Sequence, residues 1–156
     1  MPRLEELSEA QRNSALMFPC MEHDDAPSTP LGKNLSQAKV ALVTSAGLHL
    51  RGDQPFGRGD SGFRVIPADA DGRDVLMSHS SIGYDHVPFY KDVNITFPVD
   101  RMRELEKRGR VGSLSQSFYS FMGAQRDPSR IVADSAPEVA QRLLSEGVNA
   151  VLLTPT

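Results

Sequence analysis

Two short apolar segments constrain the fold of this chain more than any other feature. They span residues 39–44 (KVALVT) and 148–154 (VNAVLLT), and each has the length of a single strand. Nearly continuous apolar runs of this length are typical of strands that are covered on both faces of a parallel sheet. An amphipathic segment precedes the second run, and the order strand, helix, strand is that of α/β proteins. We therefore predict an α/β fold with a Rossmann-like or flavodoxin-like parallel sheet and flanking helices, in which both runs are buried.

The helix between the two runs is predicted to begin at Ser135. Ser135 suits the N-cap, Pro137 the first turn and Glu138 a capping box, while Glu146-Gly147 ends the helix. A second helix is predicted at residues 98–109, where a proline stands near the start and basic residues and a glycine near the end. Further strands are expected at residues 63–66, 74–77 and 111–121.

We divide the chain after residue 37. Residues 1–37 hold a short amphipathic helix at 4–16 and a proline-punctuated arm without periodicity, and residues 38–156 form the α/β domain. A chain of 156 residues fits one compact domain. The glycine-rich stretch at residues 52–62 is too irregular for a helix and is expected to be a loop.

Composition excludes several classes of function. The net charge of −3 leaves no basic surface for nucleic acid. The sequence has no apolar run of the roughly 18 residues that a membrane span needs, and no signal segment, so we expect a cytoplasmic protein without membrane contact. The single cysteine, Cys20, excludes an internal disulfide framework, and we interpret it as incidental rather than as a resolving thiol.

A dense polar segment at residues 78–94 contains the candidate site residues. His79 suits an acid/base or carboxylate-binding role and Lys91 the role of an anion partner, so these two are the catalytic candidates. The candidates for substrate binding are Ser78, His79, Asp85, Asp92 and Asn94. The alternative is a hydrogen-bonded loop with exposed charges. A metal site is not expected, because the spacing of His79 and His86 matches no ligand signature.

Three stretches carry a resemblance to a known family: residues 40–50 (VALVTSAGLHL), 78–102 and 147–156 (GVNAVLLTPT). The middle stretch is the most specific, because Ser78-His79 is followed by KDVN at 91–94 and FPVDRM at 97–102. In order and spacing these stretches resemble the selenoprotein B subunit of the glycine, sarcosine, betaine and D-proline reductases, most closely the D-proline reductase branch. The resemblance covers roughly residues 38–156.

The resemblance implies a reductive cleavage of the bond between the α-carbon and the nitrogen of an amino acid or amine, with a dithiol as electron donor. It implies an oligomeric complex in which a partner subunit carries a carbonyl cofactor, a pyruvoyl group, so that this chain itself binds no cofactor. It also implies that a redox residue, selenocysteine or cysteine, directly follows Thr156. We therefore expect the catalytic chalcogen to be absent from these 156 residues, and the chain alone to be inactive.

The coincidence of the chain end with that position suggests a reading frame interrupted at a UGA codon, and an α/β domain that is incomplete at its C-terminus. Two alternatives stay open. The chain is a non-catalytic α/β module that binds a small amine or a reductase subunit, or it is a relative that acts on a different substrate through a cysteine or selenocysteine pair. A severed sheet should aggregate, because its last strand exposes apolar surface and unpaired backbone groups.

Overall fold

The structure is a computed structural model that describes residues 3–17, 22, 24, 26, 28–81 and 83–156. Cys20 lies outside these residues. The chain divides into two units, residues 1–30 and 31–156. In the first unit, a 3₁₀ turn at Leu4–Glu6 is followed by α1 (Glu9–Leu16), which begins with a capping box between Ser8 and Gln11. One helix was predicted at residues 4–16; the chain is helical in these two pieces and not at Leu7 and Ser8 between them.

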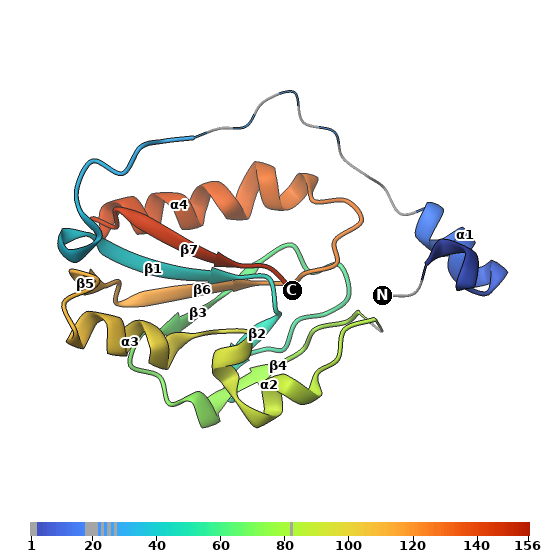
Figure 1. Cartoon of the computed structure of the whole chain (residues 1–156), viewed down its shortest axis with the longest axis horizontal. Helices are drawn as coiled ribbons and strands as arrows, with labels where there is room; N and C mark the ends of the chain where they lie inside the picture. Colours follow the sequence, from blue (N-terminus) through green and yellow to red (C-terminus); the bar gives the residue numbers. More distant parts are fainter. Residues whose placement is uncertain (1–2, 18–21, 23, 25, 27, 82) are drawn as a thin grey trace. The chain divides into compact units, whose positions relative to one another are not determined.

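The second unit is an α/β structure, as predicted (Figure 1). Its strands are β1 (Lys39–Thr44), β2 (Leu48–Leu50), β3 (Phe63–Pro67), β4 (Val75–Met77), β5 (Ser113–Leu114), β6 (Ser117–Phe121) and β7 (Ala150–Thr154). Its helices are α2 (Val87–Lys91), α3 (Val99–Lys107) and α4 (Ala136–Ser145), with 3₁₀ turns at Leu35–Gln37, Gly72–Asp74 and Val93–Ile95 and a π-helix at Ile131–Ser135.

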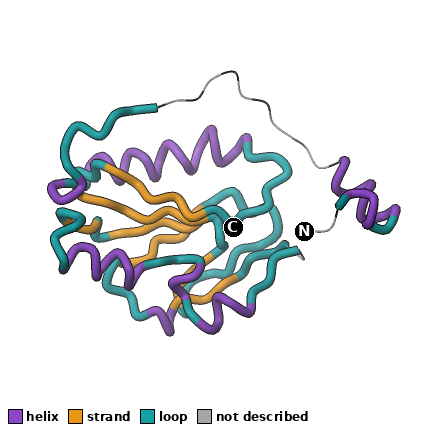
Figure 2. Tube along the Cα trace, viewed as in Figure 1, coloured by secondary structure: helices purple, strands orange, loops and turns teal. Residues whose placement is uncertain are grey.

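The main sheet is mostly parallel, and β1 lies inside it (Figure 2). β1 runs parallel to β7 on one side and to β5 and β6 on the other, while β3 is antiparallel to β6. β2 and β4 form a separate antiparallel pair. The predicted strand at residues 111–121 is divided into β5 and β6. The Ser115 nitrogen still donates to the Val40 carbonyl of β1 at 2.9 Å, whereas the Gln116 nitrogen donates to the Glu146 carboxylate at 3.2 Å.

Helices pack on both faces of this sheet (Figure 1). On one face, Tyr119 of β6 meets Phe63 edge-on at 5.7 Å, and Arg142 of α4 lies 5.1 Å from the Phe63 ring. On the other face, Phe118 meets Phe97, just before α3, edge-on at 5.9 Å. The alternation follows from the two-residue repeat of a strand. Each fully buried aromatic ring contributes roughly 1.5–3 kcal/mol to stability.

The helix before β7 starts earlier than predicted, and Ser135 is not its N-cap. The Asp127 carboxylate accepts from the Ser129 nitrogen at 3.0 Å, and helical backbone continues from there into the π-helix. Ser135 has helical angles, and its hydroxyl donates to the Ser61 carbonyl at 2.6 Å. The wider π turn falls where Pro137 has no N–H to donate, so the proline is accommodated inside the helix.

β7 (Ala150–Thr154) lies within the predicted strand at residues 148–154, but it is not buried. It pairs with β1 alone among the described residues, and its central side chains Val151, Leu152 and Leu153 are exposed. An apolar run indicates a strand but does not tell the margin of a sheet from its centre. The expected burial of this run is therefore wrong, whereas that of residues 39–44 is confirmed.

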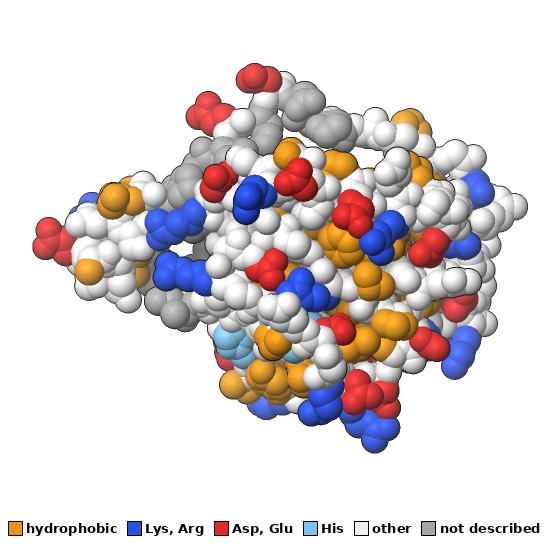
Figure 3. Space-filling model, turned by 180° about the vertical axis from the view of Figure 1, so that it is seen from behind, with side chains coloured by type: hydrophobic (Ala, Val, Ile, Leu, Met, Phe, Trp, Pro, Cys, Tyr) orange, Lys and Arg blue, Asp and Glu red, His pale blue; other side chains and the backbone are white. Residues whose placement is uncertain are grey.

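Charged side chains of both signs are interspersed on the face shown in Figure 3. No helix in the described part of the chain has the length and apolar character to cross a membrane.

Candidate functional site

The carboxyl ends of β1, β6 and β7 meet at one edge of the main sheet. The parallel register aligns Thr44 of β1 with Ser120 of β6 and Thr154 of β7. The segments that leave these strands therefore run side by side, in the place where α/β sheets usually bind ligands.

Ser45 joins the turn after β1 to the segment after β7. Its hydroxyl oxygen accepts from the Thr156 nitrogen at 2.9 Å, and its own nitrogen donates to the Thr154 carbonyl at 3.3 Å. The Thr44 hydroxyl donates to the same Thr154 carbonyl at 3.0 Å. These bonds hold the backbone of Thr156 in a defined position at the sheet edge.

His79 reaches this edge from the segment after β4. The neighbouring Ser78 nitrogen donates to the Gly47 carbonyl at 2.9 Å, which fixes the start of the segment. The His79 side chain is buried, with 7% of its surface exposed, and its Nδ1 accepts from the Ser81 nitrogen at 3.3 Å. Its Nε2 is buried and has no hydrogen-bond partner among the described residues.

The surroundings of His79 favour a neutral ring. Burial lowers the pKa of His79 below its ordinary value of 6.5, and the nearby His86 lowers it further, while the Thr156 carbonyl acts in the opposite direction. The Tyr84 ring lies 5.0 Å and the His86 ring 6.4 Å from that of His79. These surroundings favour the uncharged imidazole at neutral pH.

Gly123, just beyond β6, leaves room for these groups to approach one another. A Cβ atom at position 123 would lie 2.5 Å from the Ser45 carbonyl oxygen, 2.7 Å from His79 Nε2 and 2.8 Å from the Thr156 carbonyl oxygen. Any side chain would have to displace one of the three. We call Ser45, His79, Gly123 and Thr156 the carboxyl-edge site.

An apolar groove of about 400 Å³ adjoins this site. Its lining includes Phe121, the last residue of β6, Met122 and Gly123 just beyond it, together with Leu153 of β7 and Pro155 after it. The groove can accept the hydrocarbon part of a small molecule, whereas polar contacts would come from the carboxyl-edge site.

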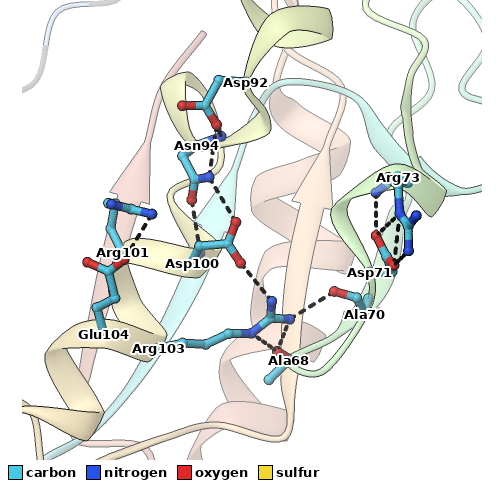
Figure 4. A network of polar contacts seen from close by, with 10 residues as sticks. All are labelled: Ala68, Ala70, Asp71, Arg73, Asp92, Asn94, Asp100, Arg101, Arg103 and Glu104. Carbon is cyan, nitrogen blue, oxygen red and sulfur yellow. Dashed lines mark hydrogen bonds and ion pairs between the residues drawn. The ribbon is translucent and has the colours of Figure 1, made fainter.

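The other candidate residues serve in local hydrogen bonding. Asp85 accepts from the Val87 nitrogen at 2.9 Å at the start of α2. Asp92 accepts from the nitrogen and the side-chain amide of Asn94, both at 2.9 Å, and these bonds lower the pKa of the Asp92 carboxyl. Asn94 is bound in turn to Asp100, at the first turn of α3 (Figure 4).

Lys91, Asp92 and Asn94 line a polar cavity of about 780 Å³. Arg103 is held beside it by Asp100 and by the Ala68 and Ala70 carbonyls (Figure 4). The structure therefore separates the predicted residues: His79 lies at the carboxyl-edge site, and Lys91, Asp92 and Asn94 lie at the polar cavity, whose lining includes none of the groove residues.

Ser78 forms a hydrogen bond with a residue that the sequence did not single out. Its hydroxyl lies 2.7 Å from Nε2 of His49, and Nδ1 of His49 lies 2.8 Å from the Leu50 carbonyl oxygen. Because Nδ1 donates to that carbonyl, Nε2 accepts from Ser78. The described residues contain no group of three or more His, Cys, Asp or Glu side chains placed to hold a metal ion.

Sequence reasoning missed Ser45 and Gly123 as site residues. The turn at 45–47 does follow β1, and Gly47 has the left-handed φ of 64° that suits glycine. The signal for Gly123 was a glycine directly after an apolar strand, at the edge where α/β proteins bind ligands. Its approach to His79 joins segments that are far apart in the sequence.

Comparisons with known proteins agree on one family. The family described as glycine/sarcosine/betaine reductase selenoprotein B matches residues 4–156. D-proline reductase subunit gamma of Acetoanaerobium sticklandii is 45% identical over 127 residues, which are 81% of this chain and 52% of that protein. Glycine reductase complex component B subunit gamma of Peptoclostridium litorale is 35% identical over 129 residues, which are 79% of this chain and 29% of that protein.

Sarcosine reductase complex component B subunit beta of Peptoclostridium acidaminophilum is 32% identical over 143 residues, 89% of this chain and 33% of that protein. The chain thus spans about half the length of the first relative and about a third of the other two. No solved structure matches the chain.

Proposed function

Because the chain belongs to the glycine/sarcosine/betaine reductase selenoprotein B family, we propose that it is part of a subunit that reductively cleaves a carbon–nitrogen bond in an amino acid or amine. The relatives are named for D-proline, glycine and sarcosine reduction, so the substrate class is a small α-amino acid or its N-methylated form. The identity of 45% with the D-proline reductase subunit favours D-proline.

One observation carries the proposal: Ser45 holds the backbone of Thr156 beside the buried Nε2 of His79. A residue that follows Thr156 would emerge at the carboxyl-edge site. We propose that this residue is selenocysteine or cysteine, as the resemblance of residues 147–156 implies. A chalcogen there would start from a backbone that lies close to His79 and to the apolar groove.

The proposed reaction balances with a dithiol as the reductant. Cleavage of the bond between the α-carbon and the nitrogen consumes two electrons and two protons, so that carbon and nitrogen each gain one hydrogen. The dithiol supplies both electrons and both protons and becomes a disulfide. The selenolate or thiolate attacks the α-carbon and the amine leaves, since the deprotonated form is the nucleophile. One thiol of the dithiol then attacks the selenium or sulfur, and the α-carbon leaves and takes up a proton. The second thiol displaces the selenolate or thiolate as the disulfide forms.

The proposal includes a partner subunit. Two of the relatives are named as subunits of a component B of a reductase complex. We propose that the partner carries a carbonyl group, which activates the substrate amine, and that the protein works in an oligomeric complex. The exposed apolar side chains of β7 support an interface at that margin of the sheet.

The polar cavity offers a second place for substrate contacts. The candidates at this cavity are Lys91, Asp92 and Asn94. Two residues that precede them in the sequence, Ser78 and Asp85, also stay candidates for substrate binding. Lys91 is exposed on α2, so it is accessible to a substrate carboxylate.

A non-catalytic interaction module is the second candidate function, and the exposed margin at β7 favours it. The two candidates differ in whether a chalcogen after Thr156 matters for any activity.

The test uses the reading frame continued past Thr156, produced together with its partner subunit. Oxidation of dithiothreitol is followed with D-proline, glycine, sarcosine or betaine. We expect turnover with at least one substrate when cysteine or selenocysteine directly follows Thr156, and none when serine does or when the 156-residue chain is used. If none of the four substrates is reduced, or if serine supports the same rate, the proposal is wrong.

A further inference from the structure

The hydrogen bonding of His79 determines which of its ring nitrogens carries the proton. Nδ1 accepts from the Ser81 backbone nitrogen at 3.3 Å, so Nδ1 is the unprotonated nitrogen of a neutral ring. The proton is then on Nε2, which is the nitrogen that borders the space next to Gly123. His79 thus presents a donor to the carboxyl-edge site.

This donor makes no hydrogen bond of good geometry among the described residues, although a backbone oxygen of Thr156 lies near the ring and only 7% of the side-chain surface is exposed. A buried polar atom without a partner is costly, so its presence calls for a partner such as a ligand, a reactive group or an ordered water. The Ser45 hydroxyl is already occupied by the backbone of Thr156. Nε2 is therefore available to bind something new; the other buried side-chain atom without a partner among the described residues, Oγ1 of Thr154, belongs to β7.

The groups around His79 do not favour its action as a general base. A catalytic histidine that takes up a proton is usually oriented by a carboxylate, which stabilises the cation. The groups that act on the His79 ring are His86, Tyr84 and a backbone oxygen of Thr156, and none of them is an Asp or Glu side chain. In a chain that continues past Thr156 this oxygen is a peptide carbonyl and not a carboxylate. His86 itself is bound to the His79 carbonyl at 3.2 Å. The surroundings favour a ring that stays neutral and donates.

Resting on the proposed function, we infer that His79 donates a hydrogen bond from Nε2 to the anionic selenium or sulfur of the residue after Thr156, and does not act as a general base. Hydrogen bonds to an anion lower the pKa of its conjugate acid. The chalcogen would be kept as the nucleophilic anion at neutral pH. Gly123 is needed for this hydrogen bond, because a side chain at position 123 would occupy the space between the donor and the anion.

The first test determines the tautomer. The chain is extended after Thr156 by one cysteine and a short Gly-Ser tail, so that the terminal carboxylate lies away from His79, and Cys20→Ser leaves one thiol. Two-bond ¹H–¹⁵N NMR at pH 7 should show His79 as a neutral ring protonated on Nε2. A ring protonated on Nδ1, or a cation, would overturn the inference without affecting the reductase assignment.

The second test measures the thiol itself. The ionisation of the added cysteine is followed by thiolate absorbance in this protein and in His79→Gln, His79→Leu and, as a distant control, Lys107→Gln. We expect His79→Gln, which keeps an N–H donor, and Lys107→Gln to leave the thiol pKa within a few tenths of a unit. His79→Leu should raise it by about one unit, a tenfold loss of thiolate at a given pH below the pKa.

Equal thiol pKa values in all four proteins, with native circular dichroism, would overturn the inference. The reductase proposal has its own test in substrate-dependent dithiol oxidation, so the two failures are distinguishable. A third result is turnover that requires the chalcogen and yet proceeds at full rate, with an unchanged thiol pKa, in the His79→Leu protein. That result would exclude the role of His79 and leave the reductase proposal intact.

Discussion

The hydroxyl oxygen of Ser45 accepts a hydrogen bond from the backbone nitrogen of Thr156 at 2.9 Å, which connects two segments that are 111 residues apart in the sequence. Both segments follow parallel strands, β1 and β7, so their meeting is a consequence of the strand pairing. The bond matters because Thr156 also borders the space next to His79 and Gly123. The pairing of β1 with β7 and the hydrogen bond of Ser45 thus place Thr156 beside the buried His79.

Replacement of Ser45 by alanine should release Thr156 from the sheet edge. The loss of this hydrogen bond should reduce the free energy of unfolding by about 1 kcal/mol, the usual net worth of one intramolecular hydrogen bond. Amide exchange at Thr156 should become faster, whereas exchange in α3 should not change. Ser145→Ala is the control, because its hydroxyl donates to the Arg142 carbonyl within α4 and not to Thr156. Equal exchange rates at Thr156 in both variants would contradict this account.

Gly123→Ala should destabilise the protein by about 1–3 kcal/mol, the usual cost of overpacking. The new methyl group would lie within 3.0 Å of Ser45, His79 and Thr156 atoms, so at least one of these segments must move. Urea unfolding measures the cost, and the ring resonances of His79 report the displacement. Gly57→Ala is the matched control, since a Cβ there meets no atom within 4 Å. A Gly123→Ala protein as stable as the Gly57→Ala protein would rule out the close approach.

Much of this fold was predictable from local sequence. β1, β3, β4 and α3 lie where apolar runs, proline and glycine indicated them, because these signals act over a few residues. Local rules failed at Ser135. The residues around it form an N-cap pattern, but its hydroxyl donates a hydrogen bond to the Ser61 carbonyl instead of capping the helix. They also failed at β7, since the position of a strand within its sheet depends on partners elsewhere in the chain.

The candidate site was predictable only in part. His79 was singled out from its polar neighbourhood and does lie at the carboxyl ends of the strands. Ser45 and Gly123 join it through pairings over long sequence separations, which no local pattern contains. Asp92 and Asn94 gave the same polar signal as His79, yet they bond to each other near α3.

The pH dependence of stability should report on His79. Its pKa is lowered in the folded protein relative to the ordinary 6.5. The folded state therefore binds fewer protons, and the stabilisation is fully present above pH 6.5 and is lost as the pH falls below it toward the folded pKa. In the chain with a tail beyond Thr156, urea unfolding between pH 7.5 and 5 should show this decrease. His79→Gln should flatten it, and an unchanged slope would exclude His79 as its source.

Asn94→Ala should separate a structural role from substrate binding. Asn94 exchanges hydrogen bonds with Asp100 at 2.9 Å in both directions and donates to Asp92, so its loss should cost about 1–2 kcal/mol of unfolding free energy. The pKa of Asp92 should rise toward its ordinary value, because Asn94 is the main cause of its decrease. A carboxyl titration by NMR measures the second effect. If the KM for the amine substrate rises while stability is unchanged, Asn94 contacts substrate instead.

The exposed margin at β7 should make this chain associate. Leu153 is 67% exposed, and the outer edge of β7 has no strand partner among the described residues. Edge strands with apolar side chains pair readily with other strands, and a lysine there opposes this because it would bury charge. Sedimentation velocity over a tenfold range of concentration should show association that Leu153→Lys reduces. Leu144→Lys, at an exposed position of α4, should leave it unchanged, since a helix surface has no unpaired backbone groups to offer. Equal effects of the two substitutions would point to general surface hydrophobicity, and a monodisperse parent chain at all concentrations would contradict the prediction.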